Sequence, residues 1–274
     1  MGRRLSLAFL TLFDAGPVEA IRAAARAGFD MVGLRLLPAA PGEAPHRILT
    51  DDRLARTVEA ELKASGIGVA DVEIVRLGAA TRVNDVRPFM ERAAQLRARH
   101  VLVAGDDPDE TRLTDNFAAL CGLAAGYGLT CDLEFMPWTQ VRRLADAHRI
   151  VARAGAANAG VLIDALHWDR AGDTAEAVAA LPPALLHFAQ FCDGPRDYGR
   201  SDEELVHLAR TARLFPGEGD IDLAALARAL PPDIPISVEV IHRERARRLD
   251  PDQRAALAYR SVRACLEHAG RTAG

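Results

Sequence analysis

Lysine is almost absent from this 274-residue sequence. The chain carries 34 lysine and arginine residues together, and Lys63 is the single lysine among them. It lies in a segment whose apolar spacing is helical, where its side chain would face water. Schiff-base aldolases and pyridoxal phosphate enzymes need a lysine in the pocket, and a P-loop needs a Gly-Lys pair. These three classes are therefore excluded, and no Gly-x-Gly-x-x-Gly motif supports dinucleotide binding.

Cysteine pairs, excess positive charge and long apolar runs are also lacking. The four cysteines lie far apart without a Cys-x-x-Cys pair, which argues against a zinc ribbon or a disulfide scaffold and favours a reducing cytoplasm. With 38 acidic residues and a net charge of −4, the chain has no basic excess for a phosphate backbone, so we expect no nucleic-acid partner. No apolar run approaches the roughly 18 residues of a membrane span, so we expect no membrane association.

What the sequence does contain is a repeated pattern. Alanine- and arginine-rich amphipathic segments end at glycine or a polar break, and a short apolar run with strand character follows each of them. Counting the opening run at residues 5–10, eight strands are expected. Alternation of strand and helix indicates parallel strands with helical crossovers, and the length is close to the roughly 250 residues of an eight-stranded barrel. We predict one α/β domain over residues 1–274, a (β/α)8 barrel, with a doubly wound sheet as the alternative.

Polar side chains stand where four consecutive strands are expected to end. Glu134 lies in CDLEF, Asp164 ends GVLID, Gln190 lies in LLHFAQF and Glu239 lies in ISVEV. In a barrel these strand ends share one mouth, where three carboxylates repel one another unless a cation neutralises them. An all-oxygen donor set suits Mg²⁺ or Mn²⁺ better than Zn²⁺. Each acid alone would be read as an exposed or capping residue, but the set of four favours one divalent metal ion.

Motifs around these positions resemble a known group of proteins. They are LEFMPW, LIDALHW, FAQFCDGP, RLFPGEGDIDL and ISVEV. In these motifs the chain is similar to the xylose-isomerase-like TIM barrel superfamily, often called the sugar phosphate isomerase/epimerase family. The resemblance implies that Glu134 and Glu239 transfer protons as well as holding the metal with Asp164 and Gln190. Many members carry histidine where this chain has Gln190, whereas inosose dehydratase-like members carry glutamine.

Further residues are expected at the same mouth. The resemblance implies that His167 and Arg213 contact the substrate. Glu73, Trp138, Arg35 and Arg243 are also candidates for the rim, although an ion pair for Glu73 and apolar packing for Trp138 are the simpler interpretations. His187, three residues before Gln190, has the opposite side-chain parity on its strand, so we expect a structural role for it. The stretch from Pro38 to Ile48 is expected to be an irregular loop at the rim.

These residues predict a divalent-metal-dependent isomerase or epimerase that acts on a keto-sugar or polyol through an enediolate. The alternative is a lyase that uses the same proton abstraction to dehydrate a keto-cyclitol or a similar β-hydroxy ketone. Apurinic-site nucleases share this barrel, but they need a histidine-rich ligand set and a basic groove, which the chain lacks. A non-catalytic scaffold would leave the four ligands unexplained. The expected partner is a small-molecule substrate, and assembly into a homo-oligomer stays open.

Overall fold

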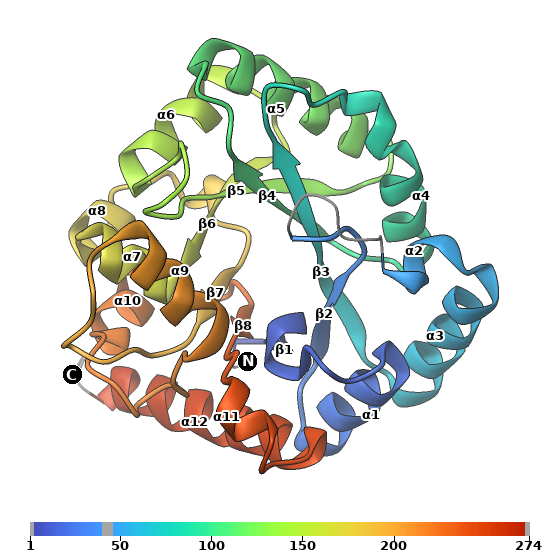
Figure 1. Cartoon of the computed structure of the whole chain (residues 1–274), viewed down its shortest axis with the longest axis vertical. Helices are drawn as coiled ribbons and strands as arrows, with labels where there is room; N and C mark the ends of the chain where they lie inside the picture. The colour runs from blue at the N-terminus through green and yellow to red at the C-terminus, as the bar shows by residue number, and fades with distance from the viewer. Residues whose placement is uncertain (1–2, 40–45, 272–274) are drawn as a thin grey trace.

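The computed structural model describes residues 3–39 and 46–271. Eight parallel strands close into one barrel, in which each strand pairs with the next along the chain and the last pairs with the first (Figure 1). This confirms the predicted (β/α)8 barrel and excludes the doubly wound sheet. The expected rim loop after Leu37 lies largely in residues 40–45, outside the described residues. The strands are β1 (Leu5–Leu7), β2 (Met31–Arg35), β3 (Gly68–Leu77), β4 (His100–Gly105), β5 (Thr130–Glu134), β6 (Ala159–Asp164), β7 (Ala189–Phe191) and β8 (Ile236–Val238).

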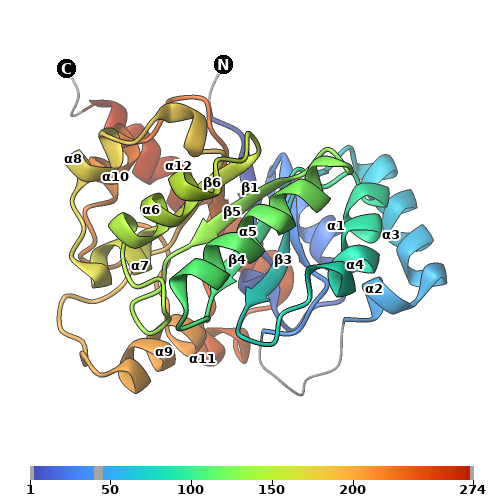
Figure 2. The same cartoon turned by 90° about the horizontal axis from the view of Figure 1, so that it is seen from above.

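Helices surround the barrel, and several begin and end at residues suited to those positions. Pro17 occupies the first turn of the first helix, and Gly28 ends it in the left-handed region at a φ of 98°. Figure 2 shows α9 and α11 together at one end of the barrel. The helices are α1 (Pro17–Ala27), α2 (Arg47–Thr50), α3 (Asp52–Ser65), α4 (Arg87–Gln95), α5 (Glu110–Ala125), α6 (Leu144–Ala154), α7 (Ala165–Ala171), α8 (Ala175–Ala179), α9 (Asp202–Thr211), α10 (Leu223–Ala229), α11 (Arg243–Ala246) and α12 (Pro251–Arg271), with short 3₁₀ turns at Phe9–Leu12, Val83–Val86 and Pro183–Leu185.

The first strand is shorter than the expected run over residues 5–10. It ends at Leu7, and Phe9–Leu12 form a 3₁₀ turn instead. The Thr11 hydroxyl explains the turn, because it donates a hydrogen bond to the carbonyl of Val238 at 2.8 Å and accepts one from the amide of Val240 at 2.9 Å. The turn is thereby fixed to the exit of β8. At the seam, Leu5 lies opposite Ile236 and Leu7 opposite Val238.

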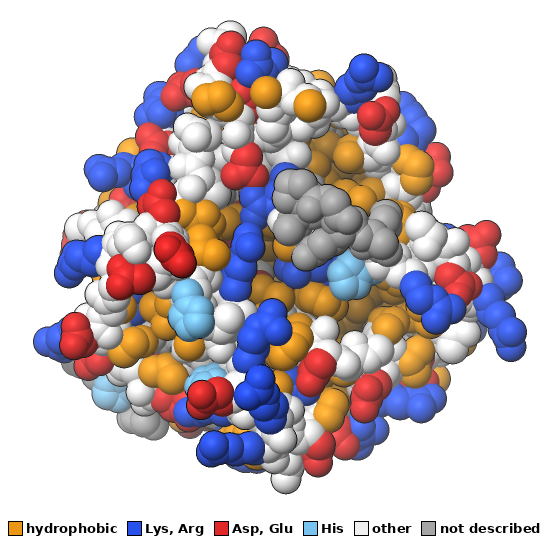
Figure 3. Space-filling view, viewed as in Figure 1, with side chains coloured by type: hydrophobic (Ala, Val, Ile, Leu, Met, Phe, Trp, Pro, Cys, Tyr) orange, Lys and Arg blue, Asp and Glu red, His pale blue; other side chains and the backbone are white. Residues whose placement is uncertain are grey.

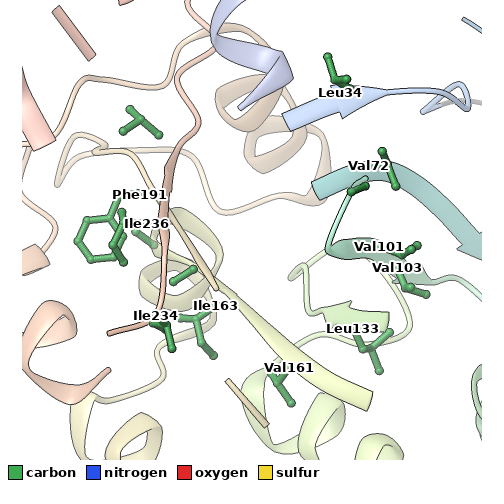
Figure 4. Close-up of a cluster of buried hydrophobic side chains, with 14 of the residues drawn as sticks. Leu34, Val72, Val101, Val103, Leu133, Val161, Ile163, Phe191, Ile234 and Ile236 are labelled. Atoms are coloured by element: carbon green, nitrogen blue, oxygen red, sulfur yellow. The ribbon is translucent and has the colours of Figure 1, made fainter. Parts of the chain in front are cut away.

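Strand side chains alternate between two apolar layers. Val101, Val103, Leu133, Val161 and Ile163 belong to the large core that packs the strands against the helices (Figure 4). The intervening residues point into the barrel, where a separate small cluster fills the middle of the axis. Its buried members are Ile74, Leu102, Ala104, Met136, Leu162 and Phe188. Polar inward-facing residues are therefore confined to regions above and below this cluster.

Candidate active site

The four predicted metal ligands lie at the same end of the barrel. Glu134 and Asp164 are the last residues of β5 and β6, Gln190 is the middle residue of β7, and Glu239 directly follows β8. Asp164 and Gln190 are direct neighbours across the β6–β7 pair. All four side chains are buried, with at most 4% of any residue exposed. The inward-facing register of four successive strands thus places an amide and three carboxylates together, as parallel barrel strands require.

Arg213, predicted as a substrate contact, lies among these carboxylates. Its Nη1 is 2.6 Å from Asp164 Oδ2 and 2.8 Å from Glu239 Oε2, and only 3% of the side chain is exposed. The backbone of Arg213 follows α9 and donates a hydrogen bond to the carbonyl of Ile241, which fixes it beside the exit of β8. Burial alone would raise the pKa of Asp164, but the Arg213 guanidinium holds that pKa below its ordinary value.

Gln190 and Glu239 form a direct pair. The Gln190 Nε2 donates to Glu239 Oε1 at 2.9 Å, whereas the buried Gln190 Oε1 has no hydrogen-bond partner among the described residues. Burial raises the pKa of Glu239 to about 7, with Arg213 opposing the shift. Burial and the neighbouring Asp164 and Glu239 raise the pKa of Glu134 well above its usual range. One guanidinium therefore does not fully compensate three buried carboxylates, and the oxygen-rich donor set suits a hard divalent cation.

His167 reaches the same centre from the first turn of α7. Its backbone amide donates to Asp164 Oδ1 at 3.0 Å, and its Nε2 lies 3.5 Å from Glu134 Oε1. Burial lowers the pKa of His167 to about 4, so the imidazole is neutral at pH 7. Ligand atoms of Glu134, Asp164 and His167 all lie within 4.8 Å of one another. His167 is thus close enough to offer a nitrogen donor, although the sequence indicated only a substrate contact.

A cavity of about 220 Å³ opens over this centre. Glu134 and Glu239 line it. The four residues predicted as substrate contacts line it as well, namely Glu73, Trp138, His167 and Arg213. The Trp138 ring meets the His167 ring edge to face at 4.9 Å. Glu73 is also ion-paired: Arg35 Nη2 donates to its Oε2 at 2.7 Å. The expected ion pair of Glu73 is therefore present, and its contact with a substrate stays a prediction.

Arginine dominates the charged lining of the cavity. Three of its described lining residues are glutamates, and five are arginines: Arg35, Arg76, Arg210, Arg213 and Arg243. Blue side chains accordingly cross the hollowed centre of the face in Figure 3. Sequence reasoning missed Arg76 and Arg210. Arg76, next to the last residue of β3, could have been found by its place near a strand end, whereas Arg210 lies on α9 and carried no such signal.

Comparison with known proteins places this geometry in a family. A model of the xylose isomerase-like TIM barrel family matches residues 21–266. The chain belongs to this family. Over 113 residues it is 32% identical to a 3-dehydroshikimate dehydratase from Pseudomonas aeruginosa, a match that covers 41% of this chain and 17% of that protein.

Solved structures share the xylose isomerase-like fold over nearly the whole chain. A xylose isomerase-like TIM barrel/4-hydroxyphenylpyruvate dioxygenase fusion protein superimposes with a TM-score of 0.82 and 23% identity, covering 98% of this chain and 43% of that one. The IOLI protein with a bound zinc atom gives a TM-score of 0.78 and 18% identity, covering 97% and 98%. The chain spans less than half of the fusion protein and of the dehydratase. No helix among residues 3–39 and 46–271 is long and apolar enough to cross a membrane.

Proposed function

We propose that this protein is a divalent-metal-dependent lyase that removes water from a small anionic β-hydroxy ketone. The observation that carries the proposal is the cavity itself, which Glu134 and Glu239 line together with five arginines. Arg35, Arg76 and Arg213 among these are ion-paired with carboxylates. Carboxylates suited to proton transfer and cations suited to an anionic group meet there within one small volume. The similarity to a 3-dehydroshikimate dehydratase supports a dehydration, because that substrate combines a ketone, a β-hydroxyl and a carboxylate.

Glu134, Asp164, Gln190 and Glu239 would hold the metal ion. The unpartnered Gln190 Oε1 and the incompletely compensated carboxylates fit such an ion, and their oxygen chemistry favours Mn²⁺ or Mg²⁺. When bound, a divalent cation supplies Lewis-acid stabilisation of the negative charge that develops on a carbonyl oxygen. Arg213 Nη1 already contacts both Asp164 and Glu239, which lowers the pKa of Asp164 and opposes the rise in the pKa of Glu239 caused by burial.

The chain's own groups carry the proton transfers. One of the glutamates, Glu134 or Glu239, takes the proton from the carbon next to the ketone, and the electron pair of that bond forms the new double bond. The β carbon–oxygen bond breaks, and the departing hydroxyl leaves as water after receiving a proton from the other carboxyl group. Arginines around the cavity hold the anionic group, and Met136 and Trp138 form an apolar wall that excludes bulk water.

The isomerase or epimerase predicted from the sequence uses the same first step. Returning the proton to the other face or the neighbouring carbon, in place of losing the hydroxyl, gives an epimer or isomer. Proton NMR in D₂O with Mn²⁺ distinguishes the two outcomes on a panel of 3-dehydroshikimate, inososes and keto-sugars. We expect a dehydrated product from a carboxylated β-hydroxy ketone and no product with Glu134→Gln. Deuterium incorporation without loss of water would contradict the lyase and assign an isomerase, and inertness toward the whole panel would contradict both.

We also propose a reducing, cytoplasmic location. All four cysteines are free thiols, and three of them are buried, as expected for a protein in a reducing compartment. To test this, cells are treated with a membrane-permeant alkylating reagent, which is kept present while the protein is denatured, and the modified thiols are counted by mass spectrometry. Four modified thiols are expected, and a disulfide would contradict the proposal.

A further inference from the structure

A second group of metal-ligating side chains lies at the other end of the barrel. His100 and Thr130 are the first residues of β4 and β5 and stand opposite each other in the sheet. Asp132 is two residues further along β5 and fully buried. His187 precedes β7, which begins only at Ala189, so strand parity does not determine where its imidazole lies. These residues form the lower cluster, and the active-site candidates lie at the opposite end of the barrel.

The donor atoms of the lower cluster converge. His187 Nδ1 lies 2.6 Å from Asp132 Oδ1, and the Thr130 hydroxyl donates to Asp132 Oδ2 at 2.7 Å. His100 Nδ1 is 2.8 Å from the Thr130 hydroxyl and 3.7 Å from Asp132 Oδ2. The two imidazoles are stacked, with centroids 6.0 Å apart and planes 8° apart. One ligand atom from each of His100, Asp132 and His187 lies within 4.8 Å of the other two.

The surrounding backbone leaves space for this cluster. A Cβ built on Gly160 of β6 would lie 2.3 Å from Asp132 Oδ1 and 2.5 Å from His187 Nδ1, so any side chain there would displace both groups. The apolar cluster containing Leu102, Leu162 and Phe188 occupies the barrel above it. The lower cluster is therefore separate from the active-site cavity. It is open to solvent at its edge, where 18% of the His187 side chain is exposed.

The chemistry of these donors differs from that of the candidate active site. Burial lowers the pKa of His100 to about 4, against the opposing effect of Asp132, so its imidazole is neutral and keeps a lone pair. Arg99 and Arg4 add to this decrease as positive neighbours. Burial acts in the same direction on His187, but its hydrogen bond to Asp132 raises the pKa of that imidazole. Two imidazole nitrogens and one carboxylate are instead typical of Zn²⁺ and related transition metals.

We propose that His100, Asp132 and His187 form a second metal site that binds Zn²⁺ with nitrogen ligands, distinct from the oxygen-rich centre at the mouth. The Thr130 hydroxyl or a water molecule would complete a tetrahedral shell. In the competing interpretation, the two histidines only compensate the buried charge of Asp132 and bind no metal.

Zinc stoichiometry tests the proposal. EDTA-treated protein is titrated with Zn²⁺ by calorimetry and equilibrium dialysis, for the natural chain and for His100→Gln, His187→Gln and His207→Gln. His207 lies exposed on α9 and is the matched control. We expect the first two variants to bind one equivalent fewer than the natural chain, or to bind that equivalent at least tenfold more weakly, with His207→Gln unchanged. Equal zinc binding by all four proteins would overturn the proposal.

A spectroscopic measurement covers the case in which a cluster variant fails to fold. Glu239→Gln weakens the oxygen-rich centre and leaves the lower cluster intact. X-ray absorption of this variant with one equivalent of Zn²⁺ should show two imidazole ligands, and Co²⁺ in its place should give the strong visible bands of a tetrahedral site. A zinc shell of oxygen donors alone would contradict the assignment, whatever the folding of the histidine variants.

Discussion

Gln190 is the residue that we expect to determine whether the proposed site prefers Mn²⁺ over Zn²⁺ or Co²⁺. Its amide oxygen is a neutral, hard donor, whereas a histidine at this position would offer a nitrogen suited to zinc and cobalt. We expect Gln190→His to raise the affinity for Zn²⁺ or Co²⁺ relative to Mn²⁺ and to add a pH dependence near 6 to 7 to metal binding. Competition calorimetry measures this. If the ranking of metals does not change, Gln190 does not bind the metal, and three carboxylates hold it with water or substrate.

His100 makes a second residue-scale prediction, on stability. Burial lowers its folded-state pKa from 6.5 to about 4, with Asp132 opposing and His187, Arg99 and Arg4 adding to the decrease. Between these pH values His100 is protonated in the unfolded chain and neutral in the folded chain. The contribution of His100 to the free energy of unfolding is therefore complete above pH 6.5 and is lost as the pH falls toward 4. The advantage of the natural chain over His100→Gln should shrink by about 3 kcal/mol across that range.

Urea unfolding at pH 7 and pH 4.5, with EDTA present to exclude metal, measures the free energies of unfolding for this prediction. His207→Gln serves as the control, because its side chain is exposed and should follow the natural chain at both pH values. Parallel pH profiles for His100→Gln and the natural chain would show that the buried imidazole is not the source of the acid sensitivity.

Sequence reasoning identified the strand-end residues because each belongs to a short apolar strand whose position is determined by local pattern. Arg213 was predicted as a substrate contact, and its ion pairs with the buried carboxylates were not predicted, because its position depends on a long segment after β7 that folds back over the mouth. Arg210 was missed for the same reason. The lower cluster depends on where β7 begins, and a strand of three residues leaves almost no periodic signal in the sequence.

At the scale of elements, Asp193 fixes the segment between β7 and β8 that contains Arg213. Its buried carboxylate accepts hydrogen bonds from the amides of Gly194, Gly217 and Ile221 at 2.8, 2.9 and 3.1 Å. The Asp193 backbone also pairs with Leu214, next to Arg213. One carboxylate thus ties the exit of β7 to the glycine-rich turn that follows α9. Removing it leaves three amides without their acceptor inside the protein.

We expect Asp193→Ala to lower the free energy of unfolding by about 3 kcal/mol, because hydrogen bonds to charged groups are lost and buried donors are left unpaired. It should also weaken metal binding, since Arg213 loses its position beside Asp164. Denaturant unfolding and calorimetry test both effects. Asp197→Ala, an exposed change in the same segment, should stay within about 0.5 kcal/mol of the natural chain. A similarly small effect of Asp193→Ala would show that the segment is held by other contacts.

At the scale of the whole molecule, the proposed metal site joins β5, β6, β7 and the exit of β8, so the ion binds only the folded barrel. At a Mn²⁺ concentration about 100 times its dissociation constant, the free energy of unfolding should rise by about 2.7 kcal/mol. Scanning calorimetry with Mn²⁺ or with EDTA measures this gain. Glu239→Gln should abolish most of it, whereas Glu267→Gln, in an exposed pair with Arg263 on α12, should retain it. Full stabilisation of Glu239→Gln would exclude Glu239 as a ligand.

Closure of the barrel between β1 and β8 has a consequence for synthesis on the ribosome. The partner of Leu5–Leu7 is Ile236–Val238, near the other end of the described chain. At translation rates of about 5 to 20 residues per second, the first strand waits roughly 10 to 50 seconds for its second neighbour. During that interval the edge strand of the nascent sheet has unpaired backbone N–H and C=O groups, which can form hydrogen bonds with another chain. Three-residue strands at the seam limit the hydrogen bonds that such an edge offers, and we expect slower translation of the second half to increase demand for chaperones.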